Sequence, residues 1–247
     1  MSKAPAADQR RLLEVQALDT KLDQLAHRRR SLDVLARITT IEERVEEAGT
    51  DLVTVRTAHA DVRRELAKAE LDVEQVRSRA ARNQARLDAG QGTAKDMQAL
   101  SHELEALARR QAELEEVELE VMERLEALDT QVAVVEGNVT ALEVELAAAV
   151  AERDAELEVI DAETASVRSA REAEAAQVSE SLLATYEKLR AQHGGVGAAL
   201  LRGSRCEGCR LDLNAGEVAT IRAAAEDEVV RCEECGRILV RAAATGS

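Results

Sequence analysis

The residues of this chain best suited to chemistry are its four cysteines, which form two Cys-x-x-Cys pairs, Cys206 with Cys209 and Cys232 with Cys235. The pairs are separated by 22 residues, and the chain has no other cysteine. Four thiolates at this spacing are typical of a structural zinc ribbon, in which each pair forms a tight knuckle and both knuckles close around one ion. The sequence therefore predicts one structural Zn²⁺ bound by these four residues.

Catalytic uses of the cysteines are disfavoured. A redox-active Cys-x-x-Cys needs only one pair, at the N-terminus of a helix in a βαβ unit, and no such unit is predicted here. A hydrolytic zinc site needs an open position for water, and four protein ligands leave none. The four histidines are scattered along the chain, and no Ser, His or Cys is placed to pair a nucleophile with a base. We expect no enzymatic activity.

Short structural elements are expected around the cysteines. Gly208 and Gly236 stand where knuckles require positive or otherwise unusual φ angles. The stretches "EVVR" and "RILVR" favour short strands. Between the pairs, Asn214 followed by Glu217 predicts the N-cap of a helix. Residues 194–247 are thus predicted to form a small C-terminal zinc ribbon domain.

The elements that precede this domain have the composition of a long coiled coil. The chain contains one Pro, one Tyr and neither Phe nor Trp, while 33% of its residues are charged. Apolar residues recur in heptads from Ile41 to Leu87 and again from Met97 to Leu146. Upstream, Leu22 to Ile38 continue the pattern in a shifted frame. Steps of three near Leu35 predict a stammer, which overwinds the coil locally.

A turn is predicted between the two heptad segments. Gly90 and Gly92 interrupt the pattern, and Thr93 can cap the helix that follows. The sequence therefore predicts a mainly α fold, with a long antiparallel coiled-coil helical hairpin over residues 8–193 and its turn near 88–95. The zinc ribbon follows this hairpin.

Charged residues predict how the two helices of the hairpin align. If the chain folds back at the glycines, the acidic run Glu113–Glu126 faces Arg56 and Arg64. In the same register Arg28–Arg30 faces the acidic stretch Glu152–Glu156. Polar residues on a seam commonly specify such an alignment. Those on this seam are His59, Asn83, Gln111 and Glu118.

The charge balance argues against strong electrostatic binding of nucleic acids or membranes. The formal net charge is -15, and the ribbon segment itself holds seven basic and eight acidic residues. The first residues contain no apolar signal segment, and no apolar run approaches the length that crosses a bilayer. We therefore expect a cytoplasmic protein that does not bind membranes.

Three stretches of the chain resemble a known bacterial family, the coiled-coil hairpin proteins with a C-terminal four-cysteine zinc ribbon. They are "GTAKDMQALSHELEAL" at the turn, "YEKLR" at Tyr186–Arg190 and "CEECGRILV" at the end of the ribbon. The resemblance extends from about residue 10 to residue 241. It implies no enzymatic activity. Members of this family are described as nucleic-acid-binding because of their ribbon, and some act as adaptors for a sigma factor, a messenger RNA or secretion chaperones. Relatives often have an aromatic residue where Val240 stands.

Two functions are consistent with these features. The first is a non-catalytic adaptor, in which the coiled coil and the ribbon dock an unidentified protein partner. The second is a nucleic-acid-binding zinc ribbon, although the ribbon contains no aromatic residue on which a base could stack. Candidate partner contacts lie at the hairpin tip and on the ribbon. They are Arg77, Arg79, Arg82, Arg86, Lys95, Arg210, Arg237 and Arg241.

One apolar segment has no partner in the predicted hairpin. Residues Ala176–Gln192 extend beyond the start of the first helix and include Leu182, Tyr186 and Leu189. They can mediate self-association, or they can dock against the ribbon or against the N-terminal Leu12 and its neighbour Leu13. The sequence leaves these alternatives open.

Overall fold

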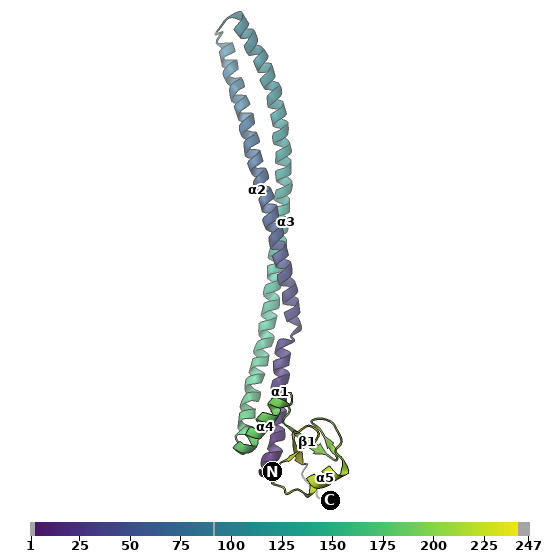
Figure 1. Ribbon diagram of the computed structural model, residues 1–247. Helices are drawn as coiled ribbons and strands as arrows, with labels where there is room; N and C mark the ends of the chain where they lie inside the picture. The colour runs from purple at the N-terminus through teal and green to yellow at the C-terminus, as the bar shows by residue number, and fades with distance from the viewer. Residues whose placement is uncertain (1–2, 91, 242–247) are drawn as a thin grey trace. The chain divides into compact units, whose positions relative to one another are not determined.

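The computed structural model describes residues 3–90 and 92–241, which divide into two compact units. The hairpin unit is Ala36–Val150, and the ribbon unit combines the described residues of Met1–Leu35 and Ala151–Ser247. The ribbon unit therefore combines the helical residues that precede and follow the two heptad segments with the zinc ribbon (Figure 1).

The hairpin unit consists of parts of two long helices, α2 (Asp33–Asp88) and α3 (Ala94–Ala175), which run antiparallel (Figure 1). Every apolar seam position predicted between Ile41 and Leu146 is buried or half-buried. Many seam residues remain partly exposed, because each helix of a two-stranded coil is covered on one side only. The heptad seam is thus confirmed.

The turn between α2 and α3 lies where the glycines predict it. Gly90 and Gly92 have φ angles of 64° and 130°, which residues with a β-carbon rarely adopt. Thr93 and Asp96 then form a reciprocal cap: the Asp96 carboxylate accepts from the Thr93 N–H at 2.8 Å, and the Thr93 hydroxyl accepts from the Asp96 N–H at 3.3 Å. The backbone hydrogen bond from Thr93 lowers the pKa of Asp96 below its usual value.

The charge register predicted for the hairpin is wrong in detail. Arg56 pairs with Glu136 at 2.6 Å, outside the acidic run 113–126, and Arg64 pairs with Asp61 of its own helix. Similarly, Arg29 pairs with Asp161 and not with the predicted stretch 152–156. Exposed ion pairs contribute little free energy, so the packing of the seam determines the alignment. One seam contact that crosses the hairpin joins His59 Nε2 to Asp129 Oδ1 at 2.8 Å.

The first helix of the ribbon unit, α1 (Ala6–Arg30), ends earlier than the heptad pattern indicates. Instead of an overwound but continuous helix near Leu35, the chain is interrupted at residues 31–32 before α2 begins. The Ser31 N–H bonds to the carbonyl groups of His27 and Arg28, which closes the last turn of α1. The frame shift is thus accommodated by a break in the helix.

The predicted second helix is also divided. It ends at Ala175, and a separate helix, α4 (Glu180–Gln192), follows a short turn. The Asp8 carboxylate of α1 accepts a hydrogen bond from the Ser179 N–H at this turn, at 3.0 Å.

Helix α4 contains the apolar segment whose partner the sequence left open. Its Leu182, Tyr186 and Leu189 are buried. They belong to one core cluster with residues of α1 and of the ribbon, among them Leu12, Val15, Ala198, Ile238 and Val240. The segment therefore packs against both predicted intramolecular partners, and the apolar surface that suggested self-association is covered within the chain.

The zinc ribbon contains a four-stranded sheet and one short helix. Its elements are β1 (Ala198–Arg202), β2 (Arg205–Cys206), α5 (Ala215–Ala223), β3 (Val230–Arg231) and β4 (Ile238–Arg241). The strand order is β2-β1-β4-β3, in which β1 and β4 are parallel and the other neighbours are antiparallel. The strands predicted around Val230 and Val240 are confirmed, and Asn214 and Glu217 form the predicted capping box of α5. Strand β1 was not predicted.

Candidate metal centre

The sheet and its knuckles bring the four cysteine sulfurs together. All four Sγ atoms lie within 4.8 Å of one another. Cys206 Sγ is 4.0 Å from Cys235 Sγ, and Cys209 Sγ is 3.9 Å from Cys232 Sγ. A tetrahedral zinc ion with bonds of about 2.3 Å separates its sulfur ligands by about 3.8 Å. The donor set and its spacing therefore fit one structural zinc ion.

The two knuckles have matching backbone geometry. The N–H of Arg210 bonds to the carbonyl of Cys206 at 2.7 Å, and that of Gly236 bonds to the carbonyl of Cys232 at 2.8 Å. Both residues that follow a knuckle are left-handed, with φ of 64° at Arg210 and 74° at Gly236. After the second knuckle the residue with positive φ is a glycine, which adopts it freely. After the first it is Arg210, whose β-carbon disfavours this conformation.

Gly208 has a role different from the predicted one. It is not among the described glycines with positive φ. A β-carbon at this position would lie 2.8 Å from Arg237 Cδ and 2.9 Å from Ala199 Cβ. Space, and not backbone conformation, explains why a glycine occupies the first knuckle.

The protein environment disfavours the thiolate form of Cys206 and of Cys232. Burial raises the pKa of Cys206, and it raises that of Cys232 to about 12. Burial also opposes ionisation of Cys235, but hydrogen bonds from the backbone and side chain of Arg237 lower its pKa to about 7. A bound zinc ion supplies the positive charge that keeps the four sulfurs as thiolates.

Two candidate contact residues of the ribbon, Arg237 and Arg241, hold its loops together. Arg237 Nε donates to the carbonyl of Val196 at 2.9 Å, and its Nη2 donates to that of His193 at 3.0 Å. Arg241 donates to five backbone carbonyls after and within α5, among them that of Ala224 at 2.7 Å. These guanidinium groups therefore satisfy carbonyls that the short elements leave unpaired. The third candidate, Arg210, is exposed.

The candidate contacts near the hairpin turn are all exposed: Arg77, Arg79, Arg82, Arg86 and Lys95. Two of them form ion pairs with α3, Arg77 with Glu115 at 2.6 Å and Arg79 with Glu103. Arg82 donates a hydrogen bond to Ser78 of its own helix. Within residues 3–90 and 92–241, Arg86 and Lys95 have no ion pair. The basic stripe is thus partly neutralised by acidic residues of the hairpin.

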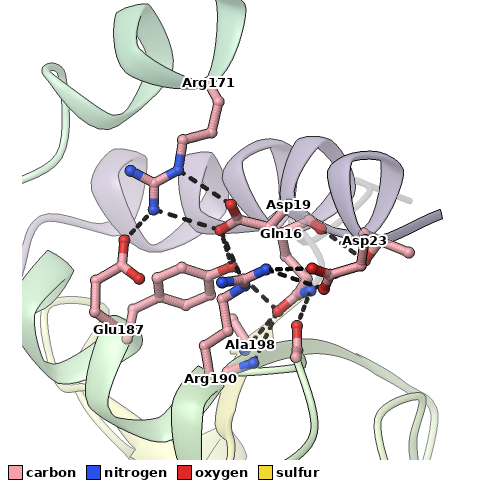
Figure 2. A network of polar contacts seen from close by, with 11 residues as sticks. Gln16, Asp19, Asp23, Arg171, Glu187, Arg190 and Ala198 are labelled. Carbon is pink, nitrogen blue, oxygen red and sulfur yellow. Dashed lines mark hydrogen bonds and ion pairs between the residues drawn. The ribbon is translucent and has the colours of Figure 1, made fainter. Parts of the chain in front are cut away.

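A buried polar network, not predicted from the sequence, ties the ribbon to the helices of its unit (Figure 2). Tyr186 donates its hydroxyl hydrogen to Asp19 at 2.7 Å, and Arg171 Nε donates to the other oxygen of Asp19 at 3.1 Å. Gln16 Oε1 accepts from the N–H of Gly197, directly before β1, at 2.8 Å. Burial raises the pKa of Tyr186 well above its usual value, so the phenol remains a donor.

The network left one signal in the sequence. Gln16 and Asp19 are spaced four and seven residues from the buried Leu12, which places them on the same face of α1. Polar residues on an apolar helix face are buried only when they have partners, and here they are 8% and 3% exposed. Their partners come from α3, from α4 and from Gly197 directly before β1, all of which lie far away in the chain.

The fold and the metal centre together define a coiled-coil hairpin protein with a structural zinc ribbon. A family model of the CT398-like coiled coil hairpin domain matches residues 15–194, and one of the C4-type zinc ribbon domain matches residues 205–239. The chain therefore belongs to the CT398-like coiled coil hairpin family. These families are structural and zinc-binding domains, not enzyme families.

Several proteins are similar to this chain over nearly its whole length. An uncharacterized Mycobacterium tuberculosis protein is 40% identical over 97% of both chains, and a Mycobacterium leprae protein is 32% identical over 90% of this chain and 95% of its own. A solved structure from Mycobacterium smegmatis is 39% identical, with a TM-score of 0.87 over 97% of this chain and 100% of that one.

A more distant structure shares the fold. The CT398 protein of Chlamydia trachomatis is 17% identical, with a TM-score of 0.67 over 96% of this chain and 98% of its own. In the part of the chain that the structure describes, no helix has both the length and the apolar character needed to cross a bilayer.

Proposed function

We propose that this protein is a non-catalytic adaptor, in which the coiled-coil hairpin and the zinc ribbon each present a surface to a protein partner. The observation that carries this proposal is the closed donor set. Four cysteines provide all the ligands that a tetrahedral zinc ion takes, so the metal stabilises a small domain and leaves no position for substrate. A domain stabilised in this way acts through its surface.

The hairpin unit supports a docking role because it exposes large apolar side chains. Leu71, Leu119 and Met122 are 56%, 60% and 48% exposed, although the seam covers most apolar residues of both helices. Exposed apolar side chains on an otherwise charged helix surface favour contact with another protein. The adaptor roles of some members of the family that the sequence resembles are consistent with this proposal.

Nucleic-acid binding is the less favoured alternative. The guanidinium groups of Arg237 and Arg241 donate to backbone carbonyls within the ribbon, which reduces the number of donors available to phosphates. Arg202 lies beside Glu207 at 3.5 Å. The exposed arginines that remain are offset by a similar number of carboxylates on the same domain.

Two parallel measurements test the proposal. In the first, the zinc-loaded full chain is used for native affinity capture with and without nuclease treatment. In the second, the protein is added to labelled single- and double-stranded DNA and RNA, and the fluorescence anisotropy of the labelled nucleic acid is measured at increasing salt. We expect capture of defined proteins that survives nuclease and is lost in a Cys232→Ser, Cys235→Ser variant or in an Arg82→Glu, Arg86→Glu variant. Nucleic-acid binding that persists at about 0.15 M salt and needs the ribbon would replace the adaptor by the alternative.

A further inference from the structure

The zinc ribbon contains a groove between α5 and β3 that the metal site does not use. Its volume is about 390 Å³. Its floor is apolar and includes Leu213, Ile221 and Val229, which are 5%, 6% and 6% exposed. Thr220 of α5, which is exposed, also lines the groove. A groove of this size holds one large apolar side chain, such as Leu or Phe, with part of the backbone that carries it.

The rim of the groove is acidic. Glu217 from α5, Glu228 from the loop before β3 and Glu233 from the second knuckle all line it, together with one basic residue, Arg231. Three carboxylates against one guanidinium give this edge a negative potential, which attracts cationic groups and repels phosphate groups. The groove therefore favours a basic occupant and disfavours a nucleic acid.

The strand beside the groove is suited to backbone pairing. Strand β3 is an outer strand, because among the described residues it pairs with β4 only. An outer strand presents N–H and C=O groups on its free side, to which an extended segment can add. Cys232 directly follows β3, so the zinc site holds the strand in place.

We propose that this groove binds an extended segment of a partner protein, in which a large apolar side chain is flanked by Lys or Arg. The apolar side chain occupies the floor, the basic residues contact the three glutamates, and the segment pairs with the free side of β3. This inference rests on the adaptor function proposed above and names the chemistry of the partner's docking segment.

Binding of three short labelled peptides of equal length to the zinc-loaded full chain tests the inference by fluorescence anisotropy. The first has one Phe flanked by Lys, the second has Ser in place of Phe, and the third has Glu in place of Lys. We expect the Phe–Lys peptide to bind at least about tenfold more tightly than either of the others. Its affinity is also expected to fall when a chelator removes the zinc.

Matched variants separate the groove from the rest of the ribbon. Thr220→Phe fills the groove, whereas Ala219→Phe adds the same ring to the neighbouring exposed position of α5, which does not line it. Likewise Glu233→Lys reverses a rim charge, whereas Glu234→Lys makes the same change one residue further on. We expect the two groove variants to weaken binding of the Phe–Lys peptide by about tenfold or more, and the two controls by less than about threefold. Zinc content and circular dichroism establish that each variant is folded.

Two outcomes overturn the inference: absence of binding of the Phe–Lys peptide up to about millimolar concentration, or binding that the groove variants leave unchanged. If native capture still retrieves proteins in either case, and Thr220→Phe does not affect it, the adaptor function stands and docking uses another surface. If capture retrieves nothing, the adaptor function itself fails. The two failures are therefore distinguishable.

Discussion

Replacing Asp19 by Asn is expected to destabilise the ribbon unit more than any comparable change on its surface. The Asp19 carboxylate is 3% exposed and accepts hydrogen bonds from the hydroxyl of Tyr186 at 2.7 Å and from Arg171 Nε at 3.1 Å. Arg190 Nε lies 3.5 Å from the same carboxylate. These three contacts join α1 to α3 and to α4 (Figure 2), so neutralising one group weakens both junctions.

The magnitude follows from the partners that remain. A hydrogen bond to a charged group contributes about 1.5–3 kcal/mol, and removing one member of a buried ion pair costs about 3–5 kcal/mol. In the Asp19→Asn variant, Arg171 keeps its contact with Glu187, and Arg190 keeps two hydrogen bonds of 2.9 Å with Asp23. The amide oxygen can also still accept from the tyrosine. We therefore expect a loss of about 2–3 kcal/mol in the free energy of unfolding of this unit.

Urea unfolding followed by tyrosine fluorescence measures this loss locally, because Tyr186 is the only aromatic residue of the chain and lies in the network. The matched control is Asp161→Asn, which removes an exposed carboxylate paired with Arg29 and is expected to cost less than about 1 kcal/mol. Equal losses in the two variants would refute the reasoning, since the buried network would then contribute no more than a surface ion pair.

Other substitutions test the ribbon and the helices. Cys232→Ser, or zinc removal by a chelator, is expected to unfold the ribbon while the hairpin helices persist, which amide hydrogen exchange resolves by segment. Gly197→Ala places a β-carbon 2.6 Å from the Tyr186 carbonyl oxygen and is expected to destabilise the ribbon unit. Gly49→Ala in α2 places its β-carbon where nothing lies within 4 Å and is expected to stabilise the hairpin unit by about 0.5–1 kcal/mol. Thermal unfolding measures both effects as a decrease and an increase in the unfolding temperature. Arg210→Gly removes the strain of a positive φ at a residue with a β-carbon and is expected to raise the free energy of unfolding of the ribbon by up to about 1 kcal/mol. A decrease would show that the arginine side chain contributes more to stability than the strain costs.

Much of this protein is determined by local patterns in its sequence. The metal ligands are encoded in the spacing of four cysteines, and the seam of the hairpin in the heptads, because both patterns relate residues through the known repeat of a short motif or a helix. The turn and the caps at Thr93 and Asn214 are equally local, since a side chain there bonds to the backbone three residues away. The structure confirms the seam, the turn and both caps, and it brings the four cysteine sulfurs together as the spacing predicts.

The tertiary structure alone decided the features that depend on partners distant in the chain. Exposed charges suggested an alignment of the two hairpin helices that the packed seam overrides. The polar residues of α1 became interpretable only when Arg171, Tyr186 and Gly197 lay beside them. Arg237 and Arg241, which looked like free surface cations, donate to backbone carbonyls of their own domain. Burial of a polar group is favourable only with a partner, and the fold, not the local sequence, determines which partner is present.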